Sequence, residues 1–117
     1  MPRVYKKLKV YDLCDGLVMD IYHSTNNFPK SELFGLTSQM RRAAVSVVAN
    51  IVEGCARYSQ KDYLRFLIIA IGSLSELGYY ISLSLRLGYI SEKEHDDLEI
   101  KHGHCIRALQ GLISSFK

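Results

Sequence analysis

The stretch FPKSELFGLTSQMRRAAVSVVANIVEG, residues 28–54, decides the fold of this chain. After Gly35 its apolar and small residues recur at intervals of three and four, which is the period of an amphipathic helix. Thr37 or Ser38 is expected to cap the N-terminus of this helix, and Gly54 is expected to follow its last turn. The stretch therefore predicts a long helix that is apolar over most of its surface.

A narrow polar stripe interrupts this apolar surface. Within about 80° of a helical wheel lie Gln39, Arg42, Ser46, Asn50, Glu53 and Arg57. A partial match farther along the chain consists of Asp62, Arg65, Ser73 and Glu76. Three interpretations stay open: a strip that faces solvent, a packed network in which Arg42 and Asn50 bind Glu53 or Glu76, and a ligand-binding or catalytic role. A packed network would fix the register of two helices more than it would add stability.

The rest of the chain also carries helical periodicity, and no stretch alternates in the manner of a strand. Helices are expected at about 8–24, 38–54 and 60–87, and from 92 to the C-terminus. Ser59 can cap the third helix, Gly88 can end it, and Ser91 with Glu94 forms a capping box for the fourth. The pattern predicts an all-α fold, an up-down-up-down antiparallel four-helix bundle, in which residues 1–117 form a single domain.

Composition fits a globular chain of this size, with 117 residues of which 48% are hydrophobic. The start of the chain has no apolar segment typical of a secretory signal, so a cytoplasmic location is expected. Cys14, Cys55 and Cys105 are odd in number and form no CxxC motif, which favours buried thiols over disulfides or a zinc site.

The third helix is long and apolar enough to raise the question of a membrane. Residues 66–85 contain a single charge, Glu76, which would lie in the middle of a bilayer at a high cost in free energy. A bundle helix without membrane contact is therefore expected. Because this helix is apolar nearly all round, four helices would leave part of its surface bare, and a homo-oligomer is predicted.

Charge is distributed unevenly along the chain. The net charge is +3, and an N-terminal arm of about nine residues holds Arg3, Lys6, Lys7 and Lys9 without any acid. These four residues are expected to join Arg41, Arg57, Lys61 and Arg65 near the turn between the second and third helices. Such a cluster predicts binding to RNA or DNA through phosphate contacts. If the cluster instead pairs with the acidic segment 92–101, a protein–protein interaction scaffold is the alternative.

Signals for enzymatic chemistry are weak. Carboxylate–histidine pairs occur at Asp20/His23, Glu92/His95 and Glu99/His102, but in an up-down bundle Glu53 lies too far from them to complete a dinuclear metal site. Neither a GxSxG motif nor a phosphate-binding glycine loop occurs. The sequence therefore predicts a protein without a catalytic site, metal or cofactor.

The opening stretch also carries a family resemblance. Its pattern, FP-x-x-E-x-x-G-L-x-x-Q-x-R-R-A-x-x-S-x-x-x-N-I-x-E-G, is followed by A-x-G-S-x-x-E-L from Ala70 and by L-G-Y-I from Leu87. These motifs resemble those of four helix bundle proteins, known as 23S rRNA intervening sequence proteins or S23 ribosomal proteins. Tyr11 stands where that family often has tryptophan.

The resemblance implies more than the fold. Related proteins include the accessory variability determinant of diversity-generating retroelements, a pentameric barrel whose basic surface binds nucleic acid and a reverse transcriptase. A pentamer is therefore the expected homo-oligomer, on the resemblance alone. For the intervening-sequence branch the family name refers to genes lodged in ribosomal RNA insertions and implies no settled biochemical activity.

Overall fold

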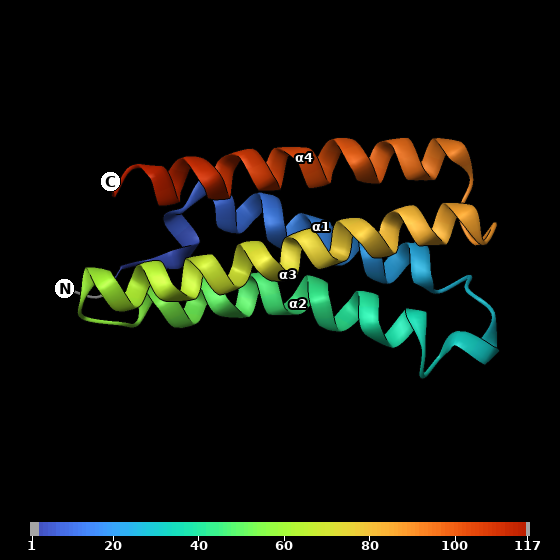
Figure 1. Cartoon of the computed structure of the whole chain (residues 1–117), viewed down its shortest axis with the longest axis horizontal. Helices are drawn as coiled ribbons and strands as arrows, with labels where there is room; N and C mark the ends of the chain where they lie inside the picture. The colour runs from blue at the N-terminus through green and yellow to red at the C-terminus, as the bar shows by residue number, and fades with distance from the viewer. Residues whose placement is uncertain (1–2, 117) are drawn as a thin grey trace.

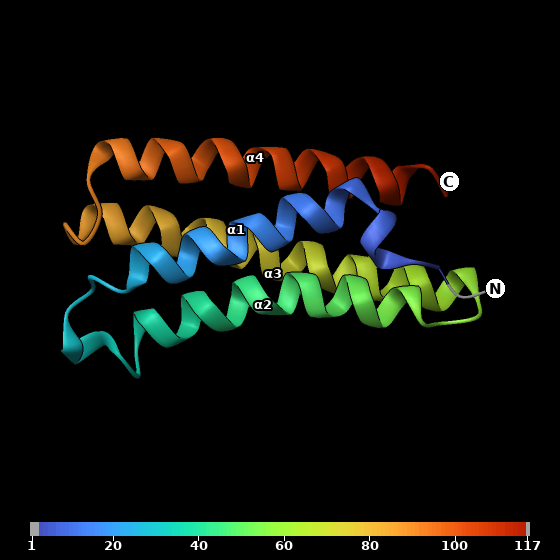
Figure 2. The ribbon, with the colours of Figure 1, turned by 180° about the vertical axis from the view of Figure 1, so that it is seen from behind.

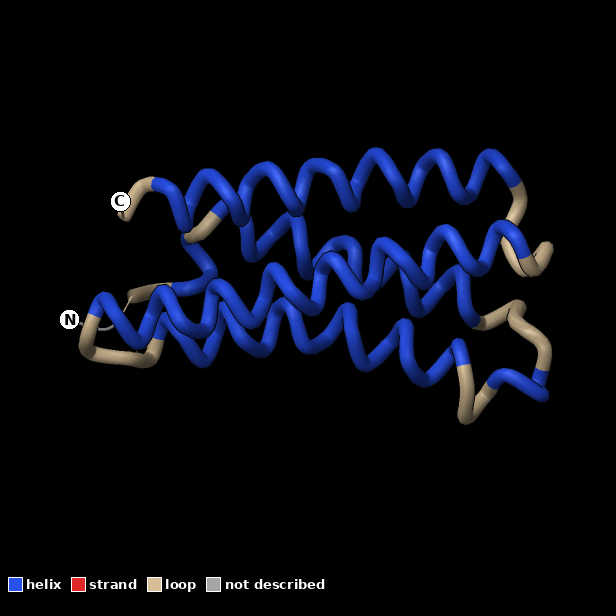
Figure 3. The backbone as a smooth tube through the Cα atoms, viewed as in Figure 1, coloured by secondary structure: helices blue, strands red, loops and turns tan. Residues whose placement is uncertain are grey.

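Four long helices run alternately up and down, as Figures 1 and 2 show from opposite sides. The computed structural model describes residues 3–116, and its long helices are α1 (Lys9–Thr25), α2 (Leu36–Cys55), α3 (Gln60–Arg86) and α4 (Glu92–Ser114). Two short 3-10 helices, η1 (Tyr5–Lys7) and η2 (Lys30–Glu32), precede α1 and α2. No strand occurs within residues 3–116, and loops lie only at the two ends of the body (Figure 3). The prediction of an all-α, up-down-up-down bundle is confirmed.

Each helix contributes one apolar face to a shared core. The buried residues recur at intervals of three and four, as in Leu67, Ala70, Leu74, Leu77 and Ile81 of α3. Burying one such leucine or isoleucine contributes about 1.5–3 kcal/mol. Helix α1 packs against α2 and α4, and α3 packs against the same two helices from the other side. The core therefore runs along the whole 45 Å length of the molecule.

Helical periodicity predicts Tyr11 on the core face of the first helix and His102 on that of the fourth, but neither side chain is fully buried. Val10 is buried on α1 in place of Tyr11, whose ring packs against Tyr5 at a centroid distance of 5.1 Å. On α4 the predicted core residue His102 is only half-buried, and its Nε2 lies 2.6 Å from the carbonyl oxygen of Leu74. The three cysteines are buried free thiols, as predicted.

The predicted N-cap of α2 and the predicted role of Gly54 after its last turn are both wrong, although the helix does end near Gly54. The helix begins at Leu36, and Thr37 is buried rather than acting as a cap. The Oε1 atom of Glu32 accepts the hydrogen bond from the Leu36 N–H at 3.1 Å, so a side chain from η2 satisfies the helix end. That bond, together with one from the Tyr89 hydroxyl, lowers the pKa of Glu32.

Gly54 lies inside α2, not after it, because the helix continues to Cys55. A Cβ atom at position 54 would lie 3.0 Å from Cβ of Phe66 and 3.1 Å from Cδ1 of Tyr63. The glycine therefore lets α2 and α3 approach closely. The other predicted ends are confirmed: Ser59 Oγ accepts the Asp62 N–H, the Ser91 capping box forms, and Gly88 has φ +75°.

Helix α3 is covered on one side only. Its core face is buried between α2 and α4, while Ile68, Ile69 and Tyr79 are 57%, 44% and 58% exposed. By length and composition α3 could also cross a membrane, a property that core helices of soluble bundles share. Its exposed apolar face is the surface for which the sequence predicts a partner.

Candidate nucleic-acid interface

The N-terminal arm, the α2–α3 turn and the end of α4 all lie at one end of the bundle (Figure 1). We call this the basic end. It carries seven of the eight predicted nucleic-acid-binding residues, namely Arg3, Lys6, Lys7, Lys9, Arg57, Lys61 and Arg65. The alternating helix directions place these segments together because α1 and α3 start where α2 and α4 end. Residues 1 and 2 of the arm lie outside the described residues.

Arg41 is at the opposite end, and its predicted place beside the α2–α3 turn is wrong. Its Nε donates to Thr25 Oγ1 at 2.9 Å and its Nη2 donates to Asn26 Oδ1 at 3.2 Å. The guanidinium also stacks on the ring of Tyr22, 4.7 Å from its centroid. Arg41 therefore ties the C-terminus of α1 to α2 and belongs to a different surface.

Arg3 holds the arm in place. Its backbone N–H donates to the carbonyl of Cys55 at 3.1 Å, and Nη1 donates to the carbonyl of Arg57 at 3.1 Å. Its guanidinium stacks on Tyr63, with Cζ 3.9 Å from the ring centroid. The same ring is buried, which raises the pKa of Tyr63 to about 12. Arg3 is thus occupied by structural contacts at the point where the arm meets the bundle.

The two arginines near the turn are also engaged. Arg57 forms an ion pair with Glu53 and stacks on Phe66, and its Nε is buried without a hydrogen-bond partner among residues 3–116. Arg65, on α3, lies 4.0 Å from Asp62, and its guanidinium also stacks on the Phe66 ring. Their charges are partly compensated, so they contribute less to the local potential than the lysines do.

Four lysines remain available. Lys6, Lys7, Lys9 and Lys61 are exposed, and none of them has a carboxylate within 4.0 Å in the part of the chain that the structure describes. The acidic start of α4 lies at the far end of the bundle, and among residues 3–116 it forms no ion pair with the arm. The acidic segment 92–101 contacts α1 through Lys101, whose Nζ lies 2.7 Å from Asp20 Oδ2.

Two further residues lie at the basic end. Arg107 was not predicted to belong to the site, whereas Tyr58 is one of three tyrosines, with Tyr5 and Tyr11, that the sequence offers for base stacking because they flank basic residues. Arg107 of α4 is exposed and lines an open cavity of about 510 Å³ together with Lys9 and His104. Tyr58, in the α2–α3 turn, is 91% exposed, whereas Tyr5 and Tyr11 pack against each other. The sequence placed a tyrosine beside Arg57 but gave no sign of which tyrosine would be free.

The polar stripe of α2 forms a hydrogen-bonded row along its seam with α3. Arg42 pairs with Glu76 and donates to Gln39 Oε1 at 3.0 Å. Ser46 Oγ lies 3.0 Å from Ser73 Oγ, and Asn50 Nδ2 donates to the Ser46 carbonyl at 2.8 Å. The Arg42 and Glu76 side chains are 50% and 37% exposed.

This arrangement combines two of the predicted alternatives. The row is a hydrogen-bonded network between two helices, as the packed-network interpretation predicts. It also lies at the surface, as the solvent-facing interpretation predicts. Asn50 binds Ser46, and Glu53 pairs with Arg57 in the turn that follows α2. Tyr80, which was not predicted to belong to the row, donates its hydroxyl hydrogen to Glu76 Oε2 at 2.7 Å.

The predicted histidine–carboxylate pairs do not gather. Within residues 3–116 no group of three or more His, Cys, Asp or Glu side chains is placed to hold a metal ion. Asp20 pairs with Lys101, His102 faces the Leu74 carbonyl, and His95 contacts Asp96 and Glu99 on its own helix. These residues therefore make structural contacts, between helices for Asp20 and His102 and within α4 for His95.

A comparison with protein-family models decides the family. The model described as "23S rRNA-intervening sequence protein" matches residues 6–111, which includes all four helices almost entirely. The chain belongs to this family. The resemblance seen in the sequence motifs is thereby confirmed. Among curated proteins no sequence matches.

A solved structure supports the fold of this 23S rRNA-intervening sequence protein. It is a protein with unknown function from the S23 ribosomal protein family of Bacteroides thetaiotaomicron. The TM-score is 0.82 at 23% identity, over 90% of this chain and 95% of that chain. At this identity the likeness shows the fold alone. The role of the basic end is therefore inferred from its own geometry.

Proposed function

We propose that this family member is a non-enzymatic, cytoplasmic homo-oligomer that binds nucleic acid through its basic end. A single observation carries the proposal. Four exposed lysines gather at one end of the bundle, and no carboxylate of the described residues lies within 4.0 Å of any of them. Lysines in this setting neutralise phosphates and release condensed counterions, which is the main source of non-specific affinity for nucleic acid.

The contacts that the basic end offers are phosphate contacts. Lys6 and Lys7 lie on η1, a single short turn, and Lys61 lies in the first turn of α3. Neither element projects from the bundle in the way that a recognition helix enters a major groove. We therefore expect little discrimination between base sequences, since sequence is read from base edges and not from the backbone.

Homo-oligomerisation would strengthen this binding. Several copies in a ring would place several basic ends on one polyanion, so the apparent affinity would exceed that of one copy. The exposed apolar face of α3 supports self-association. The number of five copies rests only on the resemblance to pentameric relatives.

The test is a fluorescence anisotropy titration with labelled single-stranded and structured RNA and DNA at several salt concentrations. Replacing Lys6, Lys7 and Lys9 by alanine should weaken binding about equally for all sequences. It should also reduce the slope of log K against log salt by about 2–3. The matched control replaces Lys30, Arg86 and Lys93, three exposed cations at the opposite end, and should leave the slope unchanged.

Two results would contradict the proposal. One is the absence of binding to every probe at low salt, which would leave the protein–protein scaffold as the better reading of the bundle. The other is an equal loss of affinity in both triple variants, which would mean that overall charge matters and the basic end does not.

A further inference from the structure

A polar pocket lies at the end of the bundle opposite the basic end, where the loop between α1 and α2 folds against both helices (Figure 1). We call it the α1–α2 pocket. Its volume is about 220 Å³, and it is lined by the end of α1, the loop that follows and the first two turns of α2. The polar side chains that line it are those of Thr25, Asn26, Lys30, Thr37 and Arg41.

Arg41 is fixed in this pocket with one edge of its guanidinium free. Its Nε and Nη2 donate to Thr25 and Asn26, and Nη1 makes no hydrogen bond within residues 3–116. The side chain is half-buried, and no carboxylate of the described residues lies within 4.0 Å of it. A partly buried charge that is held only by neutral partners favours an anion from outside the chain.

Thr37 gives the pocket a donor that the fold does not use. It is 3% exposed, and its hydroxyl makes no hydrogen bond in the part of the chain that the structure describes. Thr25, by contrast, donates to the Ile21 carbonyl at 2.7 Å and accepts from Arg41. Thr37 and Arg41 are four residues apart on α2, so they lie on the same face of the helix. A buried hydroxyl without a partner costs free energy, which a hydrogen-bonded ligand would recover.

The side-chain charge of the pocket is positive. Lys30 is exposed, and like Arg41 it has no carboxylate within 4.0 Å among residues 3–116. Glu32 belongs to the same loop, but its carboxylate accepts two hydrogen bonds from residues outside the lining and does not itself line the pocket. Carbonyl groups at the end of α1 also accept hydrogen bonds from the chain itself. Two cations without a counter-charge match a ligand with two negative charges.

One wall of the pocket is apolar. It consists of Phe28, Pro29 and Leu33. Phe28 is buried, and its ring packs against that of Tyr89 at a centroid distance of 5.2 Å, whereas Leu33 is 51% exposed. The wall therefore has a fixed inner part and an open outer part, and it can contact the body of a ligand whose charged group lies among the polar residues.

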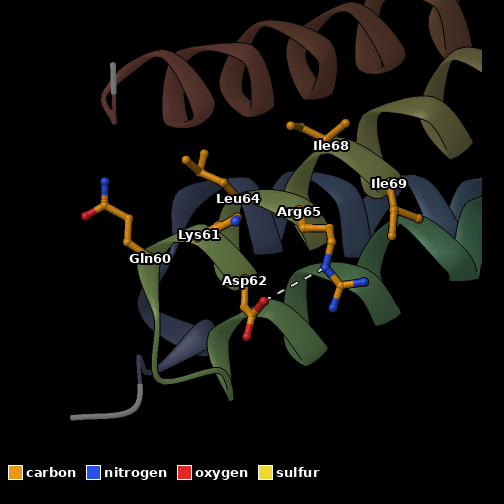
Figure 4. Close-up of a pocket in the computed structure, with 7 residues that line it drawn as sticks. All are labelled: Gln60, Lys61, Asp62, Leu64, Arg65, Ile68 and Ile69. Carbon is orange, nitrogen blue, oxygen red and sulfur yellow. Dashed lines mark ion pairs between the residues drawn. The ribbon is translucent and has the colours of Figure 1, made fainter.

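The apolar depression along the first half of α3 has a different character. It has a volume of about 620 Å³, and Figure 4 shows Leu64 and Ile68 in it together with the Asp62–Arg65 ion pair. All of its lining residues belong to one helix, and its arginine has an acid partner of its own. The α1–α2 pocket instead combines two helices and a loop around an arginine that has no such partner.

We infer that the α1–α2 pocket binds a small phosphomonoester, that is, a phosphate group on an apolar or aromatic body. The phosphate accepts hydrogen bonds from the free guanidinium edge of Arg41 and from the Thr37 hydroxyl, and Lys30 balances its second charge. The body packs on the wall from Phe28 to Leu33. An internal phosphate of a nucleic-acid strand carries one charge and a sugar on either side, so it does not match this pocket. The inference does not depend on the proposed function.

The test is a titration of the full chain with phenyl phosphate, inorganic phosphate and benzoate, followed by amide NMR. Phenyl phosphate should give saturable shifts centred on residues 25–41, which contain the whole lining. Inorganic phosphate lacks the apolar body and benzoate lacks the second charge, so each should bind about fivefold more weakly. Inorganic phosphate that binds as tightly as phenyl phosphate would overturn the phosphomonoester and leave free phosphate as the ligand.

Thr37→Val separates ligand binding from stability. Because the hydroxyl has no partner among the described residues, valine should keep or raise the urea midpoint, yet it should weaken phenyl phosphate binding about tenfold. Lys30→Gln should weaken binding about threefold to fivefold. Lys93→Gln is its matched control, since Lys93 is exposed at the same end and does not line the pocket. Arg41 is not substituted, because it also ties α1 to α2.

Three results would overturn the inference. The first is the absence of saturable shifts in residues 25–41 with all three probes, or shifts centred on the basic end instead. The second is wild-type affinity in both Thr37→Val and Lys30→Gln. The third is a loss of stability in Thr37→Val, which would mean that the hydroxyl serves the fold and not a ligand.

Discussion

Arg42 of α2 forms an ion pair with Glu76 of α3, and Glu76 also accepts the hydrogen bond of the Tyr80 hydroxyl. These contacts explain the polar stripe on the otherwise apolar helix α2, because the stripe lies where α2 packs against α3 at the surface. Because both partners are near half exposed, solvent screens the pair, and its value lies more in fixing helix register than in stability.

We expect a small but measurable coupling between these two residues. A double-mutant cycle with Arg42→Ala and Glu76→Ala should give about 0.5–1 kcal/mol from urea midpoints, and the coupling should fall at high salt. Arg65 and Asp62, 4.0 Å apart and more exposed, provide the control cycle and should give close to zero. A coupling as small at Arg42–Glu76 as in the control would mean that the row does not act as a network.

Replacing Gly54 by alanine should destabilise the bundle. The added Cβ would lie 3.0 Å from Phe66 and 3.1 Å from Tyr63, so α2 and α3 would have to move apart, at a cost of about 1–3 kcal/mol. Gly72 of α3 is the matched control because nothing lies within 4 Å of its Cβ position. Gly72→Ala should be neutral or stabilising by up to about 1 kcal/mol, from helix propensity. Equal effects at the two positions in thermal unfolding would contradict the close-approach role of Gly54.

Gly54 also shows what the sequence could and could not predict. The sequence predicts the helix ends at Ser59, at Gly88 and at the Ser91–Glu94 capping box correctly, because a cap depends on residues only a few positions away. A glycine near a helix end has two explanations, a left-handed turn or a close approach. Only the position of α3 decides between them.

The sequence predicts that basic residues form the candidate site, but it does not predict where every one of them lies or which are free. Bundle topology gathers the arm with Lys61, and this followed from helix order alone. The prediction places Arg41 at the same end, although Arg41 lies fourteen positions before Cys55, the last residue of α2, which is about 21 Å along the helix. Whether a cation is free also depends on contacts that no pattern encodes, as the stacking of Arg3 on Tyr63 shows.

Stability should fall as pH rises above 10 because of Tyr63. Burial raises its pKa to about 12, so between its unfolded value of 10.0 and about 12 the folded state holds a proton that the unfolded state has lost. Stability is therefore complete below pH 10 and decreases through this window, by up to about 2–3 kcal/mol. In Tyr63→Phe this part of the decrease should disappear. Because other groups titrate in both proteins, the difference between the two urea-midpoint profiles is the quantity to measure, and parallel profiles would contradict the assignment.

Tyr58 should make the basic end favour single-stranded nucleic acid. Its ring is 91% exposed in the turn between Arg57 and Lys61, so a base that is free to leave its stack can pack on it beside the lysines. Tyr58→Ala should weaken binding to single strands by about 1–3 kcal/mol per stacked base and leave duplex binding nearly unchanged, whereas Tyr58→Phe should retain the affinity. The fluorescence of 2-aminopurine in the strand is quenched by stacking, so it should drop on binding to the wild type and to Tyr58→Phe but not to Tyr58→Ala. A strand that binds all three proteins with equal affinity and unquenched fluorescence would restrict the contact to phosphates alone.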